Sequence, residues 1–341
     1  MRDQIKEGKY KPGDKIPTVR EFAGKYALNK TTVNSAILNL ATEGLIVSYP
    51  GRGTFVVKPK KEKKPAIIGY IFDSGVSREY PSVAFHIRRL TRKFAAKHYS
   101  LVADEYPAEG GICENHDFQE KIRNHFFSGL IAYTLLNVED IVFLKKNHVP
   151  LVIVGEEAND GNTASVCADM FEAGMMLTEH LIKLGHKKIV LLTGPEGNKA
   201  GELLELGYRA VMMKHGLLYP TEYVVHGPWG EESGQNLAEQ ILDLKARPTA
   251  IITAEEIMAL GVMRKFLEKG YRVPEDFSIA GLGDRMPVSV YPVPLTVSDT
   301  DEEAQILKAA DLLMDLMQGK DVNKKIKLMP KLIARQSSGK I

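Results

Sequence analysis

Residues 18–43 read TVREFAGKYALNKTTVNSAILNLATE and hold two short helical patterns, one on each side of a three-residue break. Apolar residues recur at helical spacing in both patterns, at Val19, Phe22, Ala23 and Tyr26 and then at Val33, Ala36, Ile37 and Leu40. The break is Ala27-Leu28-Asn29, and asparagine is a residue type that caps a following helix. The sequence therefore predicts a helix-turn-helix whose second helix begins near Lys30.

Two strand-like runs follow at residues 45–48 and 54–57, joined by a glycine-rich turn that carries Arg52. The second helix has short polar side chains in its first turns, which suit the base edges and phosphates of a major groove. A narrow turn with an arginine at its tip suits a minor groove. Any one of these features also fits an ordinary three-helix mini-domain, but their order predicts a winged helix-turn-helix that binds double-stranded DNA.

Charge is distributed unevenly along the chain. Residues 1–64 hold 14 Lys and Arg against 6 Asp and Glu, a balance of +8, so the remainder carries −6 of the total of +2. A basic head on an acidic body indicates a polyanionic partner at one end only, although surplus lysines also serve solubility. The polar, proline-containing run at 58–65 is typical of an exposed linker. We therefore predict a DNA-binding domain at 1–57, a linker at 58–65 and a second domain at 66–341.

Beyond residue 65, short apolar strands alternate with amphipathic helices. Strands are predicted at 67–72, 101–103, 129–132, 151–154, 188–193, 250–253 and 278–281, and helices at 83–97, 139–147, 171–184, 204–215, 231–244, 255–269 and 301–318. Continuous apolar strands separated by helices form parallel sheets buried on both faces. There are more strand–helix units than a single sheet usually holds, which predicts two Rossmann-like lobes. The expected fold class is multi-domain, with an α+β head and a two-lobed α/β body.

Several classes of function are disfavoured by what the sequence lacks. No G-x-G-x-x-G follows the first strand of the body and no Walker lysine is present, so we expect no nucleotide cofactor. Cys113 and Cys167 are far apart and in no ligand-like spacing, so we expect neither a metal site nor a disulfide. No Ser-His-Asp, Cys-His or paired acid–base arrangement stands out, and we expect no catalytic residues. The polar residues 1–7 and the absence of a long apolar run lead us to expect a cytoplasmic protein without a membrane partner.

Residues 11–23, 29–33, 43–46 and 51–56 together resemble the winged helix of the GntR family. Many family members have an arginine where this chain has Asn34, which implies altered base readout at that contact. The chain also begins at Met1 inside what the family pattern gives as the first helix, so a misassigned start or a trimmed sequence is left open. The resemblance implies DNA contacts, with Arg20 and Lys30 mainly on phosphate, at Arg20, Asn29, Lys30, Thr31, Thr32, Asn34, Gly51 and Arg52.

From Ser165 onward the chain resembles the sensor domain of the LacI/GalR repressors, which is itself similar to type I periplasmic sugar-binding proteins. The motifs that carry this resemblance lie at 165–169, 184–189, 207–209, 247–251, 273–279 and 335–337, while residues 65–162 match more loosely. A GntR head on a LacI-type body is the arrangement of the arabinose-repressor subgroup.

This resemblance implies that a ligand binds between the lobes, at loops that leave the carboxyl ends of the strands. Trp229 is the only tryptophan and stands where family members place an aromatic that stacks on the sugar, although packing between lobes is an alternative role. Several carboxylates of the set are equally suited to cap helices. The residues that we expect at this site are Asp73, Ser74, Tyr80 and Glu156 from the first lobe and Asp169, Trp229, Glu255 and Asp284 from the second.

Three positions depart from the family's ligand-binding pattern. Leu204 replaces a common arginine, Glu255-Glu256 replaces Asn-Asp, and Leu282-Gly283-Asp284 replaces a residue followed by two aspartates. Losing an arginine and gaining a glutamate disfavours an anionic ligand and favours a neutral or amino sugar.

The function that we expect is that of a homodimeric repressor whose affinity for operator DNA is controlled by a small molecule, such as L-arabinose or another neutral monosaccharide. One alternative is a regulator that responds to a metabolite other than a sugar. Another is a transport-type solute-binding protein, against which the DNA-binding head argues. The third, an aminotransferase body on a GntR head, would need a buried Schiff-base lysine in a larger catalytic domain.

Overall fold

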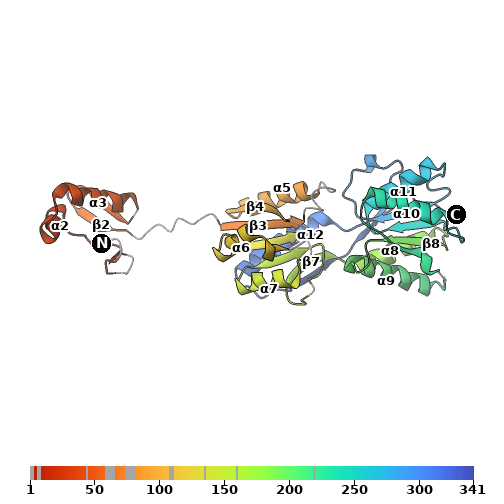
Figure 1. Cartoon of the computed structure of the whole chain (residues 1–341), viewed down its shortest axis with the longest axis horizontal. Coiled ribbons are helices and arrows are strands. Elements are labelled where there is room, and N and C mark those ends of the chain that lie inside the picture. The colour runs from red at the N-terminus through yellow and green to blue at the C-terminus, as the bar shows by residue number, and fades with distance from the viewer. Residues whose placement is uncertain are drawn as a thin grey trace. The chain divides into compact units, whose positions relative to one another are not determined.

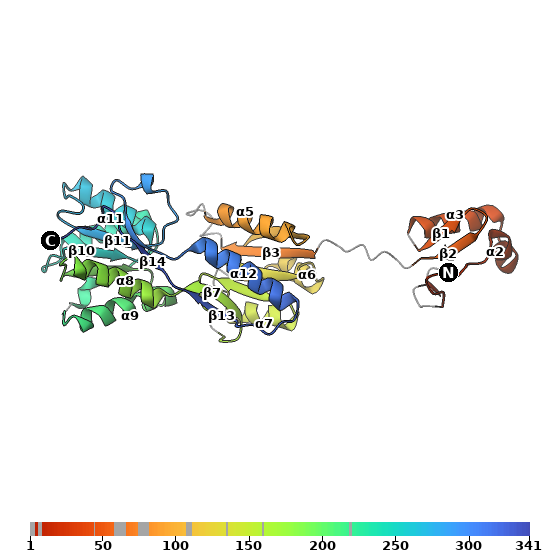
Figure 2. The same cartoon turned by 180° about the vertical axis from the view of Figure 1, so that it is seen from behind.

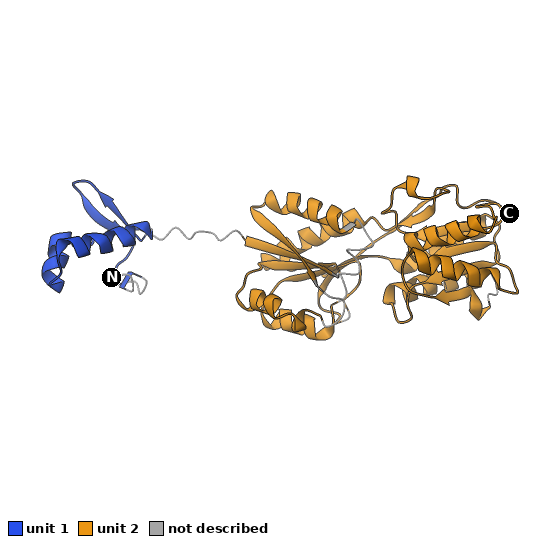
Figure 3. Cartoon of the chain, turned by 45° about the horizontal axis from the view of Figure 1, so that its top comes forward, with its two compact units in different colours: residues 1–64 blue, residues 65–341 orange. Residues whose placement is uncertain are grey.

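The computed structural model describes residues 4–5, 9–43, 45–57, 66–73, 82–106, 111–133, 136–158, 160–217 and 220–341. The chain divides into two compact units, Met1–Lys64 and Pro65–Ile341, drawn in blue and orange in Figure 3. We call them the head and the body and describe each by itself. The predicted linker at 58–65 lies outside the described residues.

The head is a helix-turn-helix followed by a hairpin. It contains α2 (Val19–Tyr26), α3 (Lys30–Thr42), β1 (Ile46–Tyr49) and β2 (Gly53–Val56), labelled in Figures 1 and 2. A capping box starts α2, because Thr18 Oγ1 accepts the backbone N–H of Glu21 at 3.3 Å while Thr18 N donates to the Glu21 carboxylate at 2.6 Å. The helix ends at Ala27, whose φ of 51° is left-handed and turns the chain toward α3.

A small apolar core holds the head together. The hairpin is antiparallel, with Ile46 opposite Val56, and the side chains of both residues are buried. Leu40 from α3 and Ile16, which precedes α2, are buried against them. The predicted helix-turn-helix and the predicted hairpin are therefore confirmed.

The first lobe of the body contains a six-stranded parallel sheet in the order β13-β7-β6-β5-β3-β4. Two of its elements, α12 and β13, come from near the end of the chain and join a sheet that otherwise forms from residues 66–168. The elements are β3 (Ala66–Asp73), α5 (Ser82–Ala95), β4 (Tyr99–Tyr106), a 3-10 turn (Ile112–Glu114), α6 (His116–Arg123), β5 (Gly129–Tyr133), α7 (Val138–Lys146), β6 (Leu151–Val154), β7 (Ala164–Ala168), α12 (Glu302–Met317) and β13 (Lys325–Leu328).

The second lobe contains a sheet in the order β14-β12-β11-β10-β8-β9, in which only β14 is antiparallel to its neighbour. Its elements are α8 (Met170–Lys183), β8 (Ile189–Thr193), α9 (Lys199–Lys214), a 3-10 turn (Thr221–Tyr223), β9 (Val224–His226), α10 (Glu231–Leu242), β10 (Ala250–Thr253), α11 (Glu256–Glu268), β11 (Ser278–Leu282), a 3-10 turn (Val288–Val290), β12 (Thr296–Asp299) and β14 (Lys331–Ile333).

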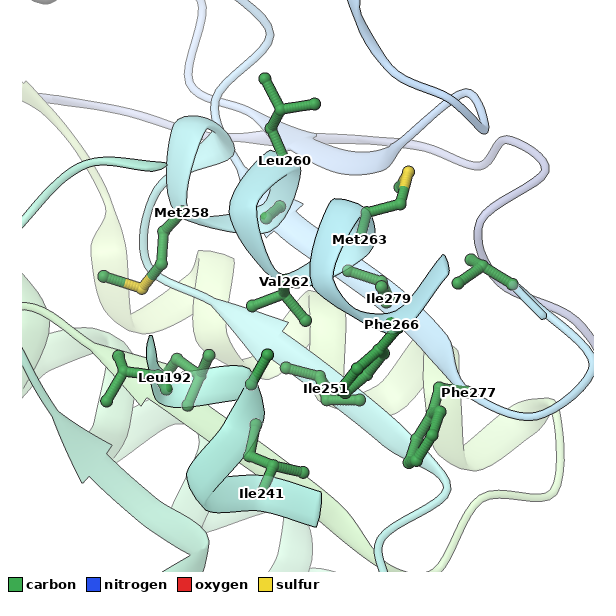
Figure 4. Close-up of a cluster of buried hydrophobic side chains, with 14 of the residues drawn as sticks. Leu192, Ile241, Ile251, Met258, Leu260, Val262, Met263, Phe266, Phe277 and Ile279 are labelled. Carbon is green, nitrogen blue, oxygen red and sulfur yellow. The ribbon is translucent and has the colours of Figure 1, made fainter. Parts of the chain in front are cut away.

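Alternate residues of each central strand enter opposite cores, because side chains of a strand point to its two faces in turn. In the second lobe, Ile251 and Ile279 pack under α10 and α11, together with the stacked rings of Phe266 and Phe277 at 4.3 Å (Figure 4). Ile252 packs on the opposite face, under α8 and α9. The continuous apolar strands of the sequence are thus buried on both faces, as predicted.

The chain passes between the lobes three times. It leaves the first lobe between β7 and α8, returns between β12 and α12, and leaves again between β13 and β14. The first and third of these crossings are joined by a hydrogen bond of 2.9 Å from the backbone N–H of Asp169 to the carbonyl of Leu328. Relative movement of the lobes must therefore be taken up at residues 168–170, 299–302 and 328–331.

Most predicted helices and strands of the body lie within a few residues of their observed positions. The prediction at 204–215 was wrong at its start, because α9 begins at Lys199, where Asn198 Oδ1 accepts the backbone N–H of Gly201 at 2.8 Å. None of the described helices is long and apolar enough to span a membrane.

Candidate nucleic-acid interface and ligand cleft

The first turns of α3 place polar side chains on the surface of the head. Asn29 caps the helix, since its Oδ1 accepts the backbone N–H of Thr32 at 2.8 Å and the Thr32 hydroxyl at 3.0 Å. Lys30, Thr31 and Asn34 are exposed, whereas Val33 faces the core and is 5% exposed. The helix end carries a partial positive charge and free surface donors, which together favour contacts with phosphate and with base edges.

The tip of the hairpin is a second exposed, basic feature. Gly51 and Gly53 adopt φ values of 73° and 110°, which side chains other than glycine rarely tolerate, so these two glycines allow the tight turn. Arg52 between them is exposed, with its guanidinium 5.8 Å from the centre of the Tyr49 ring. Arg20 is exposed on α2, so all eight predicted DNA-contact residues lie on the surface of the head.

A small cavity lies between the two lobes of the body, where the carboxyl ends of β6 and β7 meet the start of α9. Its free space is about 20 Å³, enough for a water molecule but not for a sugar in this arrangement of the residues. The first lobe and the first crossing line it with residues 155–157, 167–170 and Lys327, and the second lobe with Lys199, Ala200 and Leu203.

Glu156 lines this cavity, and one of its carboxylate oxygens is unsatisfied. The Oε2 atom is buried and has no hydrogen-bond partner among the described residues. Burial raises the pKa of this carboxyl above its usual range, and the nearby Lys199 opposes the shift. A buried acceptor without a donor is unfavourable, so a ligand hydroxyl or ammonium group at this place would stabilise the site.

The other described carboxylates of the predicted site already have partners. Asp169 caps α8 by accepting the backbone N–H of Glu172 at 3.2 Å, which is the helix-capping role that the sequence also allowed. Asp284 forms a two-pronged ion pair with Arg335, with oxygen–nitrogen distances of 2.8 and 2.7 Å. Their roles in ligand binding stay predictions, and Glu156 is the described member of the set that has a buried oxygen without a donor.

Trp229 and Glu255 are brought together by the loop before α10. Trp229 is 37% exposed, and its ring packs directly on Gly194, where an added Cβ would lie 2.1 Å from the ring. The carboxylate of the buried Glu255 accepts the backbone N–H of Gly230 at 2.9 Å and so fixes the residue next to the tryptophan. The ring is therefore held at the carboxyl end of the second sheet with part of its surface open to solvent.

Three further predicted residues precede α5 in the first lobe. Asp73 is the last residue of β3, at the carboxyl edge of the first sheet. Ser74 and Tyr80 lie outside the described residues. Their roles at the ligand site stay predictions.

Sequence reasoning missed a polar cluster that contains Arg285 and the glutamate beside the predicted Glu255. Glu256 is fully buried and accepts from the Arg285 side chain at 2.9 Å and from the backbone N–H of Arg285 at 2.8 Å. The sequence feature that could have indicated this cluster is the position of Arg285, which follows Asp284 just after the carboxyl end of a strand. Leu204, which stands in place of the family's arginine, is 1% exposed and lies in the core of the second lobe.

The described residues contain no group of three or more His, Cys, Asp or Glu side chains that could hold a metal ion. Cys113 and Cys167 are both free thiols.

Comparison with known families and proteins agrees with these features. Residues 1–56 match the family of bacterial regulatory proteins called gntR, and residues 178–338 match a periplasmic binding protein-like domain. The arabinose metabolism transcriptional repressor of Geobacillus stearothermophilus is 27% identical over 351 residues, which cover 99% of this chain and 95% of that protein.

Two solved structures share the architecture of the body. A regulatory protein of the LacI family from Chloroflexus aggregans matches with a TM-score of 0.73 and 26% identity, covering 80% of this chain and 98% of that one. The lac repressor dimer bound to operator and the anti-inducer ONPF matches with a TM-score of 0.67 and 26% identity, covering 82% and 96%. The predicted winged-helix head and two-lobed body are thereby confirmed, and the named relatives are transcription regulators rather than enzymes.

Proposed function

Because the chain joins a DNA-binding head of the bacterial gntR family to a periplasmic-binding-protein-like body, we propose that it is a transcriptional repressor controlled by a small molecule. The observation that carries this proposal is the capped, polar and exposed start of α3 on a head with a charge balance of +8. A transport-type solute-binding protein has no need of such a surface, whereas a protein that binds double-stranded DNA does.

In the proposed complex, α3 enters the major groove and the hairpin tip approaches the minor groove. Lys30 and Arg20 bind phosphates, Thr31, Thr32 and Asn34 read base edges, and Arg52 follows the minor groove. Two copies bind two half-sites of an approximate palindrome, since a two-fold dimer matches a two-fold operator. The lac repressor, whose body is similar, binds its operator as a dimer, which supports this arrangement.

The proposed effector is a neutral or amino sugar bound between the lobes. Trp229 is an aromatic side chain that is partly exposed, and Glu156 offers a buried acceptor without a donor. The similar protein from Geobacillus stearothermophilus is a repressor of arabinose metabolism, which supports L-arabinose as the first candidate. Binding would change the separation of the lobes and thereby the affinity for DNA, and by linkage DNA would change the affinity for the sugar by the same factor.

The DNA half of the proposal is tested by fluorescence anisotropy with a labelled fragment of the protein's own promoter at salt concentrations between about 50 and 200 mM. We expect affinity to fall steeply with salt, and the Arg52→Ala and Lys30→Ala variants to reduce the slope by about 0.9 for each phosphate that the variant no longer neutralises. Lys25→Ala is the matched control, because it removes the same charge from an exposed position outside the proposed interface. Equal affinity for the promoter and for a scrambled fragment would refute sequence-specific repression.

The effector half is tested by titrating the emission of the single tryptophan with L-arabinose, D-glucose, D-glucosamine and D-glucuronate. We expect a neutral or amino sugar to change the emission and to change DNA affinity at the same concentrations. Glu156→Gln keeps the size of the side chain but removes its charge, so it should weaken D-glucosamine more than a neutral sugar. A response to D-glucuronate alone would overturn the charge argument, and a response to none of the four would favour a metabolite other than a sugar.

A further inference from the structure

The hairpin of the head has a short third strand, which comes from the segment before α2. The backbone N–H of Ile16 donates to the carbonyl of Thr54 at 2.9 Å, and Lys15 pairs with Phe55 in antiparallel register. Residues that stand directly opposite each other on neighbouring strands point to the same face of a sheet. This segment therefore places a lysine on the same face of the hairpin as Phe55.

The face that carries Phe55 is the outer face of the hairpin. Ile46 and Val56 are buried in the core of the head, and the side chains of a strand alternate between its two faces. Phe55 and Tyr49 therefore point away from that core, and Tyr49 is 48% exposed. Their ring centres are 6.0 Å apart, so the outer face presents two neighbouring aromatic rings.

A cation lies beside each of these rings. The guanidinium of Arg52 is 5.8 Å from the centre of the Tyr49 ring, and the ammonium of Lys15 is 5.9 Å from the centre of the Phe55 ring. Both distances are within the range of about 6 Å over which a ring attracts a cation. Both cations are exposed, and neither forms an ion pair with a carboxylate of the described residues. Their charges are therefore available to a partner outside the head.

Gly53 brings the charged end of Lys15 close to the tip of the hairpin. A Cβ added at Gly53 would lie 2.4 Å from Cε and 3.1 Å from Nζ of Lys15, so the lysine side chain crosses the place where another residue would have its own side chain. Packing of this kind restricts the rotamers of the lysine before any partner binds. Less side-chain entropy is then lost when the ammonium group makes a contact.

We propose that the outer face of the hairpin, formed by Lys15, Tyr49, Arg52 and Phe55, is an additional phosphate-binding surface of the head. This inference rests on the proposed function and adds to it a DNA contact at Lys15, outside the helix-turn-helix and the hairpin tip. The two phosphate strands that border a minor groove are only about 6 Å apart. When Arg52 approaches that groove, a cation on the side of the same hairpin meets one of the bordering phosphates. Tyr49 is a positioning residue that acts through the guanidinium of Arg52.

A lysine that packs on a glycine and a ring could also serve only to stabilise the hairpin, and two substitutions separate these roles. Lys15→Met keeps an unbranched apolar side chain on Gly53 and Phe55 but removes the charge, whereas Lys15→Arg keeps the charge. Lys25→Met is the matched control. Lys25 is exposed, lines the same groove of the head as Lys15, and has its ammonium 5.6 Å from the centre of the Tyr26 ring, but it belongs to α2 and not to the hairpin.

The test is fluorescence anisotropy of the full chain with a promoter fragment and with a scrambled fragment, between about 50 and 200 mM salt. We expect Lys15→Met to lower the slope of log affinity against log salt by about 0.9, the value for one phosphate, and to weaken both fragments by the same factor, because phosphate carries no sequence information. Lys15→Arg and Lys25→Met should keep the wild-type slope. The thermal midpoint of the head, followed by circular dichroism, should be the same in all of these variants.

The positioning role of Tyr49 is tested in the same assay. Tyr49→Ala should weaken DNA binding by about two- to fivefold, the value of one exposed cation–ring contact, while Tyr49→Phe should bind like the wild type. In an Arg52→Ala background, Tyr49→Ala should cause no further loss, since the cation that the ring holds is already absent.

Three results would overturn the inference. An unchanged slope in Lys15→Met, while the wild type binds the promoter in a salt-dependent way, would remove the contact at Lys15 and leave the proposed function intact. An equal reduction in Lys25→Met would mean that the slope reports only the net charge of the head. Salt-independent binding, or no binding, by the wild type would refute the proposed function and this inference together.

Discussion

Substitution of Gly194 by alanine should displace the single tryptophan and expose it. A Cβ on Gly194 would lie 2.1 Å from Cη2, 2.2 Å from Cζ2 and 2.8 Å from Cζ3 of Trp229. Carbon atoms prefer a separation of about 3.5–4.0 Å, so the ring must retreat by about 1.5 Å. Overpacking of this kind costs about 1–3 kcal/mol, and each kcal/mol corresponds to about 2–4 °C in the melting temperature of a unit this large.

Two measurements check this prediction. The displaced ring should be quenched more strongly by acrylamide and should emit at longer wavelength, because the indole loses its support and gains solvent. The thermal midpoint should fall by several degrees in the wild-type background but by little in a Trp229→Ala background, where the added methyl group has no ring to strike. An unchanged emission spectrum and an equal loss of stability in both backgrounds would refute the steric argument. A displaced ring should also weaken any effector that stacks on it.

Further predictions concern helix packing and pH. Gly207→Ala should lower the melting temperature of the body, because its Cβ would lie 2.1 Å from the carbonyl oxygen of Phe171 on α8 and this overlap outweighs the gain of about 1 kcal/mol in helix propensity. In α2, a Cβ added at Gly24 would have no atom within 4 Å of it. Gly24→Ala should therefore raise the free energy of unfolding of the head by up to about 1 kcal/mol, measured by thermal unfolding followed by circular dichroism. Burial lowers the pKa of His186 from its ordinary value of 6.5, so the folded chain binds fewer protons than the unfolded chain. The urea midpoint of the body should therefore be highest above about pH 6.5 and fall as the pH drops below it, and a His186→Asn variant should show a smaller fall.

Much of the fold could be predicted because the buried strands are continuous apolar runs in the sequence. All the residues of β8 and of β10 are buried, so these strands appear in the sequence as continuous apolar runs. Strand β13 could not be predicted in this way, because it lies at the edge of its sheet and alternates lysines with apolar residues, none of them fully buried. Its place depends on pairing with β7, which is distant in sequence.

The candidate site was predictable to a smaller extent. Family likeness pointed to Trp229 and Glu156, and the structure places both at the carboxyl ends of strands. Arg285 could not be assigned a role, since its partner Glu256 reaches it from a distant part of the sequence. A sequence pattern identifies residue types at strand ends, but it does not say which of them meet.

The late arrival of α12 and β13 has a consequence for biosynthesis. A ribosome that has released residues 170–299 has delivered nearly all of the second sheet, while the older first sheet still lacks its edge strand and the helix that covers one face. The second lobe of the nascent protein should therefore be able to form its sheet first, and the first lobe should remain open to chaperones until residues 302–328 have emerged.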